Sequence, residues 1–140
     1  MVHQFTVDGT PKSLQAKPQS KKAWQDKIKA AAWEAVPEEL RVTHEEIAVV
    51  LVHFCFDEED SGDVDNIVKP ILDALAGPVF GDDRQVTQVL VRRTSLSARM
   101  STAIDEPPPL LAAALQSAVV NRRDFVYIRV DEAPNHHRLP

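Results

Sequence analysis

The sequence predicts a single α/β (α+β) domain made of one four-stranded β-sheet and about three helices. Two observations predict this class: strand-like and helix-like segments alternate in the order βα-βα-βα-β, and no linker or internal repeat divides them. A chain of 140 residues, 44% of them hydrophobic, suits one domain with its own core. We expect this domain to span residues 1–132 and a flexible tail to follow over residues 133–140.

The first half of the chain contains two predicted strands and one predicted helix. Residues 2–7 alternate in polarity, as a half-buried strand does. A helix is expected from an N-cap at Ser20 to about Val36. Residues 45–56 are apolar and rich in β-branched types, which indicates a central strand covered in part on both faces. The helix residues with the spacing of one buried face are Trp24, Ile28, Ala31, Ala32 and Ala35.

The second half repeats this alternation. A helix is expected from about residue 66 to 76, with Pro70 near its first turn, where a missing N–H costs least. Residues 86–93 alternate as a strand, and residues 109–120 form a helix after three prolines. Residues 125–131 are the last strand, with an apolar face of alternate residues.

Composition narrows the class of protein. Cys55 is the only cysteine, so an intrachain disulfide is excluded and a reducing compartment fits. The N-terminal segment lacks the pattern of a signal peptide, and no run approaches the ~18 apolar residues of a membrane helix. We therefore expect a soluble cytoplasmic protein without a membrane partner. The sequence contains no P-loop, GxGxxG or zinc-ligand spacing, so we expect no small-molecule cofactor.

Charge is distributed unevenly along the chain. The net charge is −5, which is unusual for a protein that contacts phosphates. Residues 1–30 hold six Lys against two Asp, whereas residues 31–66 hold eleven acidic residues against one Arg. The acidic stretch fits either a cation site or a solvated loop, and the basic stretch fits a phosphate-facing surface.

Two carboxylates flank Val64 after the predicted central strand. In an extended chain, Asp63 and Asp65 would point the same way, roughly 6–7 Å apart, with Val64 toward the core. Helix capping, worth about 1 kcal/mol, accounts for one of them. Two close like charges repel unless a cation or a proton intervenes, which favours a hard-cation site.

Further charged residues follow on the predicted helix and after it. Lys69 lies one turn after Asp65, so it either forms an ordinary ion pair or directs a cation toward a phosphate. Asp73, one turn further, either orients Lys69 or faces solvent. Asp82 and Asp83 are typical of a turn, although the loop before them is long enough to return to the start of the helix. His53 and Cys55 alternate on the central strand and are expected in the core rather than as metal ligands.

The chain contains the pattern D-x-D-N-x-x-K-P-x-x-D-A-L, followed by G and by D-D-x-Q-V, which closely resembles the signature of the RusA family of Holliday-junction resolvases. Its segment G-x-P-x-S-x-Q at residues 9–15 is similar to the N-terminal segment of that family. The signature residues are Asp63, Asp65, Asn66, Lys69, Pro70, Asp73, Ala74, Leu75, Gly77, Asp82, Asp83, Gln85 and Val86.

The resemblance implies a RusA-like fold with a mixed sheet and a set of functional residues. It implies Asp63, Asp65 and Asp83 as ligands of Mg²⁺, with Mn²⁺ as an alternative ion, and Lys69 as the catalytic lysine. It implies a homodimer that makes paired symmetric nicks in four-way DNA during recombination and repair. Asp73, Asp82 and Asn66 are expected to support the site. The candidate DNA contacts are Lys12, Lys17, Lys21, Lys22, Arg84, Arg92 and Arg93.

The sequence is compatible with other functions. The acidic run at residues 57–60 should weaken DNA binding or make it more salt-dependent. A branched-DNA-binding protein that cleaves little, and an interaction domain with a structural cation, are the two non-enzyme hypotheses. The sequence also does not separate a junction resolvase from a nuclease for flaps.

Overall fold

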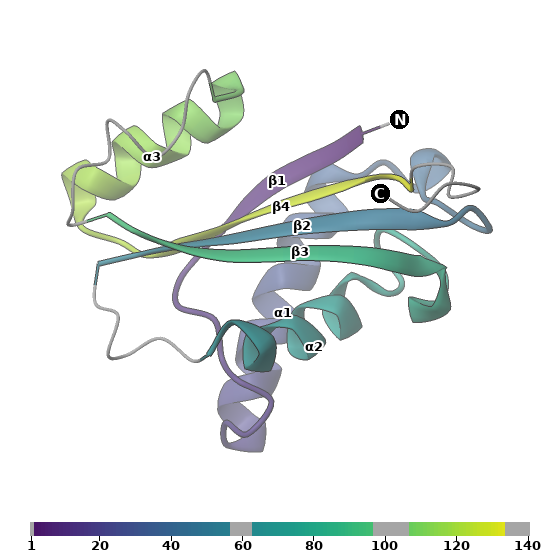
Figure 1. Ribbon diagram of the computed structural model, residues 1–140, viewed down its shortest axis with the longest axis horizontal. Coiled ribbons are helices and arrows are strands. Elements are labelled where there is room, and N and C mark those ends of the chain that lie inside the picture. The colour runs from purple at the N-terminus through teal and green to yellow at the C-terminus, as the bar shows by residue number, and fades with distance from the viewer. Residues whose placement is uncertain (1, 57–62, 97–106, 134–140) are drawn as a thin grey trace.

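The computed structural model describes residues 2–56, 63–96 and 107–133. Strands and α-helices alternate along this part of the chain, as predicted, and two short 3₁₀ turns are added (Figure 1). The elements are β1 (Val2–Asp8), α1 (Pro18–Ala35), η1 (Glu38–Leu40), β2 (Ile47–Cys55), α2 (Val64–Leu75), η2 (Asp83–Gln85), β3 (Val86–Ser95), α3 (Pro109–Asn121) and β4 (Phe125–Glu132).

The four strands form one mixed sheet in the order β1-β4-β2-β3. β4 pairs antiparallel with both β1 and β2, whereas β3 pairs parallel with β2. A parallel pair needs a crossover connection, and α2 supplies it between β2 and β3. The apolar segment predicted as the central strand is therefore an interior strand of a mixed sheet, and these predictions are confirmed.

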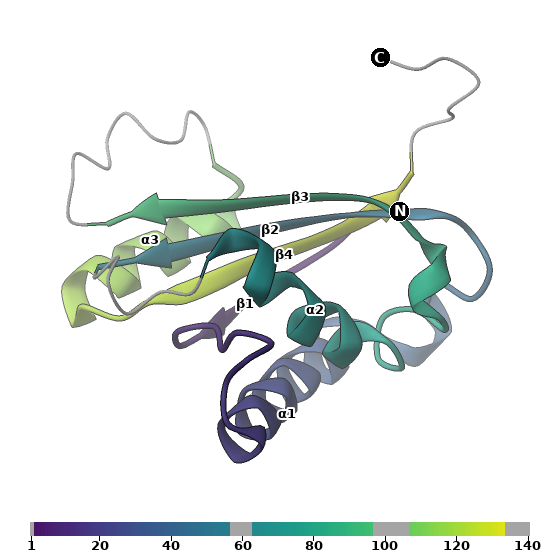
Figure 2. The same ribbon diagram turned by 60° about the horizontal axis from the view of Figure 1, so that its bottom comes forward.

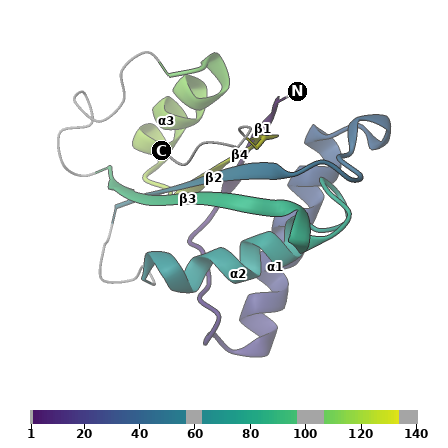
Figure 3. The ribbon, with the colours of Figure 1, turned by 45° about the vertical axis from the view of Figure 1, so that its right-hand side comes forward.

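The helices divide between the two faces of the sheet. α1 and α2 lie against one face, and α3 covers one end of the other face (Figures 2 and 3). The larger core lies under α1 and α2 and includes Trp24, Ile28 and Ala32 of the predicted stripe, while Ala35 is exposed. A smaller cluster, which includes Phe54 of β2, packs under α3. β2 is thus covered on both faces in part, as expected.

The start of α1 differs from the prediction. The helix begins at Pro18, with Lys17 as the N-cap, so Ser20 lies inside the first turn and is not the cap. Proline suits the first helical position because its fixed φ is already helical and the N–H that it lacks would have no partner there. The helix therefore begins earlier than expected.

The helix α2 also begins earlier than predicted, and this changes the role of Pro70. Because the helix starts at Val64, Pro70 is an interior residue and not part of the first turn. An interior proline leaves the carbonyl four residues earlier without its helical donor. That carbonyl belongs to Asn66, and it accepts a hydrogen bond of 2.9 Å from the N–H of Leu14. Gln25 of α1 also donates its side-chain amide to the Pro70 carbonyl, at 3.0 Å.

Two predicted segments fall partly outside the described residues. The acidic run at residues 57–60 and all of the predicted tail except Ala133 lie there, and the N–H of Ala133 donates to the Glu46 carbonyl at 3.0 Å. Of the helices that the structure describes, none combines the length and apolar character that crossing a membrane requires.

Candidate active site

Asp63 and Asp65 occupy the first positions of α2. Asp63 is the N-cap residue, and its side chain makes no capping hydrogen bond. Asp65 is the second helical residue, and both acids are exposed. The predicted extended arrangement, with Val64 pointing to the core, is wrong: Val64 is 37% exposed and already helical. The N–H of Asn66 bonds the Asp63 carbonyl at 2.9 Å, so the chain turns immediately after Asp63.

Lys69 connects α2 with the turn that precedes β3. Its Nζ donates to Oδ1 of Asp73 at 2.8 Å and to Oδ2 of Asp83 at 3.5 Å. Asp73 lies one helical turn away, but Asp83 comes from η2, fourteen residues along the chain. The structure therefore brings the signature lysine and the second half of the signature together. The return that the sequence allowed was to Asp63 and Asp65, and among the described residues these two acids and Asp83 do not form a group that could hold a metal ion.

Gln85 holds the turn that carries Asp83. It is buried, and its Oε1 accepts hydrogen bonds from the N–H groups of Gly81 and Asp82 at 2.8 and 2.9 Å. Its Nε2 donates to the carbonyls of Val42 and Glu45, which precede β2, at 3.3 and 3.1 Å. One side chain thus ties η2 to the chain before the central strand, and this tie limits where Asp83 can lie.

Asp82 caps the same turn. Its Oδ1 accepts from the N–H of Arg84 at 2.9 Å, and with Gln85 it completes a capping box. The Arg84 N–H, which donates to this carboxylate, holds the pKa of Asp82 below its usual value. Asp82 therefore has a structural task in the turn, while the neighbouring Asp83 faces Lys69.

The carboxylates around Lys69 determine its protonation state. Asp73 first, and Asp83 after it, raise the pKa of Lys69 above 10.5. The side chain is 52% exposed, so water can reach the ammonium group. Near neutral pH the group carries a full positive charge, which suits it to offset charge on a phosphate and not to accept a proton.

The signature acids have the chemistry of a hard-cation site. Carboxylate oxygens are the protein ligands that Mg²⁺ prefers, and Asp63, Asp65 and Asp83 supply only oxygen donors. Asp65, Lys69 and Asp73 follow at intervals of four residues, so they share one face of α2. Among the residues that the structure describes, no group of three or more His, Cys, Asp or Glu side chains is arranged to hold a metal ion.

Asp124, immediately before β4, is a residue that the sequence did not indicate. Its carboxylate accepts from the Phe56 N–H at 3.0 Å and from the Thr10 hydroxyl at 3.0 Å, and it contacts His53 Nε2 at 3.3 Å. Its carbonyl accepts from the Gly9 N–H at 2.8 Å. Asp124 therefore joins the end of β2, where the chain leaves toward Asp63, to the loop after β1.

His53 is buried, as predicted for a core residue, and so is Cys55. Burial lowers the pKa of His53 below 6.5, and the nearby Asp124 opposes this effect in part. Its Nδ1 has no hydrogen-bond partner among the described residues. The neutral imidazole fits the packed environment between the sheet and the helices.

The candidate DNA contacts lie in three separate regions of the described chain. Lys12 and Lys17 are exposed, Lys21 donates to the Leu14 carbonyl at 3.4 Å, and Lys22 pairs with Asp26 at 2.9 Å near the start of α1. Arg84 is 91% exposed on η2. Arg92 and Arg93 are exposed on β3 and alternate between the two faces of the sheet.

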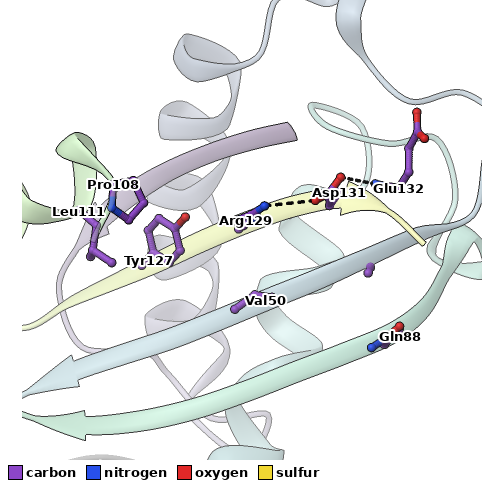
Figure 4. A pocket seen from close by; sticks show the side chains of 9 residues that line it. Val50, Gln88, Pro108, Leu111, Tyr127, Arg129, Asp131 and Glu132 are labelled. Atoms are coloured by element: carbon purple, nitrogen blue, oxygen red, sulfur yellow. Dashed lines mark hydrogen bonds and ion pairs between the residues drawn. The ribbon is translucent and has the colours of Figure 1, made fainter. Parts of the chain in front are cut away.

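A cavity of about 420 Å³ lies on the opposite face of the sheet, away from the signature residues (Figure 4). Val50, Tyr127 and Leu111 line its apolar part. At its polar end, Arg129 pairs with Asp131 at 3.3 Å. None of the signature residues lines this cavity, so the candidate active site is the exposed acidic surface of α2 and η2.

Comparison with known proteins points to one family. The family model described as "Endodeoxyribonuclease RusA" matches residues 4–104 of the 140-residue chain. The match includes the whole signature from Asp63 to Val86, together with the N-terminal segment that contains Gly9 and Lys12. Among curated proteins, no match is found.

Proposed function

We propose that this chain, which belongs to the RusA endodeoxyribonuclease family, resolves four-way DNA junctions by paired, Mg²⁺-dependent nicks in recombination and repair. The family supports a nuclease that acts on Holliday junctions. The observation that carries the proposal is the approach of Lys69 Nζ to Asp83 Oδ2 at 3.5 Å. It brings the cation and one acid of the signature from separate elements to a single exposed surface.

The proposed metal ligands are Asp63, Asp65 and Asp83. A bound Mg²⁺ would polarise the scissile phosphate and lower the pKa of an attacking water. The exposure of Asp63 and Asp65, and the absence of a side-chain cap at Asp63, leave their oxygens accessible to an ion. Both stand at the N-terminus of α2, where the helix dipole favours negative charge.

Lys69 would act on the phosphate by its charge. Asp73 holds the ammonium group at 2.8 Å and limits the volume in which it moves. A fixed cation at the position where negative charge develops lowers the barrier more than a mobile one. Asp73 is thus a positioning residue in this proposal, and Asp82 and Asn66 support the site through the turn and through the first turn of α2.

We further propose that the active form is a homodimer. A four-way junction presents two symmetric strands for cleavage, and a two-fold dimer places one site on each. The paired character of the nicks is the property that requires the second protomer.

The proposal is tested by cleavage of a labelled four-way junction beside a linear duplex of the same sequence, with and without Mg²⁺. Wild type is compared with Asp65→Asn and with Glu34→Gln, a matched loss of one exposed carboxylate on α1. Paired, Mg²⁺-dependent nicks are expected on the junction with wild type and Glu34→Gln, and none with Asp65→Asn. Cleavage by Asp65→Asn at the wild-type rate would contradict the assigned site.

A flap substrate and a binding assay separate the alternative functions. If wild type binds the junction but leaves it intact in both Mg²⁺ and Mn²⁺, the chain is a branched-DNA-binding protein and the catalytic proposal is wrong. If the flap is cleaved and the junction is not, the protein is a nuclease, as proposed, but its substrate is a flap and not a four-way junction.

A further inference from the structure

A second cavity, of about 420 Å³, lies between the loop after β1 and the first turns of α1. Two ammonium groups line it: Lys12 from the loop and Lys27 from the helix. None of the signature acids lines it. Its lining residues are Gly9, Thr10, Lys12, Ser20, Ala23, Trp24 and Lys27.

The cavity is bounded by backbone that the fold holds in place. Gly9 has a φ of +125° and lies so close to α1 that an added Cβ would be 3.3 Å from both Lys27 Nζ and Trp24 Cζ3. The Gly9 N–H is tied to the Asp124 carbonyl at 2.8 Å, and the Trp24 side chain is buried. The missing side chain at Gly9 therefore allows the Lys27 ammonium group to lie beside the anchored loop.

The polar groups in the cavity suit an anion. Neither Lys12 nor Lys27 has an ion-pair partner among the described residues, whereas Lys22 on the same helix pairs with Asp26 at 2.9 Å. The Thr10 hydroxyl donates to Asp124 and is not available as a donor. Two ammonium groups and the Ser20 hydroxyl thus remain as exposed donors, since the unpaired Nε1 of Trp24 is buried. Two uncompensated cations in a concave site attract negative charge.

The loop connects this cavity to the candidate active site. Lys12 is two residues before Leu14, whose N–H bonds the carbonyl of Asn66, the residue that follows Asp65. Two residues of extended chain span roughly 7 Å. Each strand of DNA carries a phosphate about every 3.4 Å of helix axis, so a strand cleaved at α2 has other phosphates within reach of the cavity.

We propose that this cavity binds a non-scissile phosphate of the DNA strand being cleaved, through Lys12, Lys27 and Ser20. The proposal rests on the proposed nuclease function and adds a positioning subsite to it. A phosphate held here would fix the register of the strand relative to Asp65 and Lys69, because Leu14 and Asn66 tie the loop to the catalytic helix.

The test compares the loss of two lysines that are two residues apart on α1. Lys27 lines the cavity, whereas Lys29 is exposed and does not. Junction affinity is measured by fluorescence anisotropy over a range of salt concentrations, in the Asp65→Asn background to prevent cleavage. We expect Lys27→Ala to weaken binding about tenfold and to reduce the slope of log K against log salt by about 0.9, the value for one phosphate contact. Lys29→Ala should retain the slope.

A neutral phosphate analogue identifies the contact itself. Single methylphosphonates are placed in turn along one strand of the junction. We expect one position to weaken the binding of protein that has Lys27 and to have no further effect on Lys27→Ala. Thermal melts of both variants should match the parent, because both side chains are exposed.

The outcomes separate this proposal from the function on which it rests. If Lys27→Ala and Lys29→Ala lose the same affinity and slope, the lysines act only by diffuse attraction, and the subsite is overturned while the nuclease proposal stands. If no methylphosphonate position depends on Lys27, the subsite is likewise overturned. A protein that neither binds nor nicks the junction overturns both proposals.

Discussion

Replacement of Lys69 by methionine separates a catalytic role for this lysine from a structural one. Lys69→Met keeps most of the side-chain length and a good helix former on α2, but it removes the ammonium group. The change breaks two contacts, of 2.8 Å to Asp73 and 3.5 Å to Asp83, at a site that is about half exposed. Both acids are then left with water and not in an apolar environment.

The two expected magnitudes differ strongly. Exposed ion pairs contribute about 0–1 kcal/mol to folding, so the free energy of unfolding should fall by about 1 kcal/mol at most. For a chain of this size, this corresponds to a Tm lower by about 4 °C or less. Loss of one fixed charge that stabilises a transition state typically costs about 10²- to 10³-fold in kcat. Junction nicking should therefore fall at least a hundredfold while the fold is nearly unchanged.

Single-turnover nicking of the junction and thermal melting measure these two quantities on the same preparation. Asp73→Asn is the matched control, because it removes the negative charge of the partner at 2.8 Å and leaves the charge of Lys69 in place. We expect it to lose about tenfold or less. Activity of Lys69→Met within about fivefold of wild type would refute the role of the lysine, and a Tm loss above about 10 °C would show that the change acts on folding.

The other predictions concern the turn, the buried histidine and the metal. Gln85→Leu removes four hydrogen bonds and should lower the Tm by about 5 °C or more in thermal melts. The control Gln88→Leu changes an exposed residue of β3 and should leave the Tm within about 2 °C. Equal effects of the two changes would show that Gln85 does not stabilise the turn. Burial lowers the pKa of His53 below 6.5, so as the pH falls the unfolded chain binds a proton at this histidine before the folded protein does. The free energy of unfolding therefore keeps its full value above about pH 6.5 and decreases below it. His53→Gln should therefore lose less Tm than wild type between about pH 7 and 5.5, and an unchanged loss would assign the acid sensitivity to other groups. Mg²⁺ should raise the Tm of wild type and not of Asp65→Asn in thermal-shift titrations, since binding to the native state alone stabilises it; the same rise in both would remove Asp65 from the proposed ligands.

Periodicity alone predicted most of the fold. The order of strands and helices follows from apolar spacing, and the central position of β2 follows from its uniformly apolar composition. The first residues of α1 and α2, Pro18 and Val64, were not predicted. The first turn of a helix depends on capping and on backbone angles, which the spacing of apolar residues does not report. The second error concerns the candidate site, because it led us to expect Asp65 in an extended segment, whereas this residue lies in the first turn of α2.

The candidate site was predictable only in part. The signature identified Lys69 and Asp83, but their contact depends on the path of the loop between them, and loop length allows that path without requiring it. The sequence did not indicate the role of Asp124, because its partners lie far away in the chain and belong to no local pattern. These partners are Thr10, His53 and Phe56, which are 114, 71 and 68 residues away. Contacts of this kind arise from tertiary packing and are not encoded in any short segment.

The proline inside α2 makes this helix dependent on a distant part of the chain. Its missing donor is replaced by Leu14, so the backbone hydrogen bonding of the first turn is completed only when the N-terminal segment has docked. This contact joins residues 52 positions apart and has to wait for long-range loop closure during folding. A shortened chain that starts after residue 17 would keep every acid of the signature and still present α2 with an unpaired carbonyl beside Asp65. Expression trials that trim the N-terminus should therefore score loss of activity separately from loss of fold.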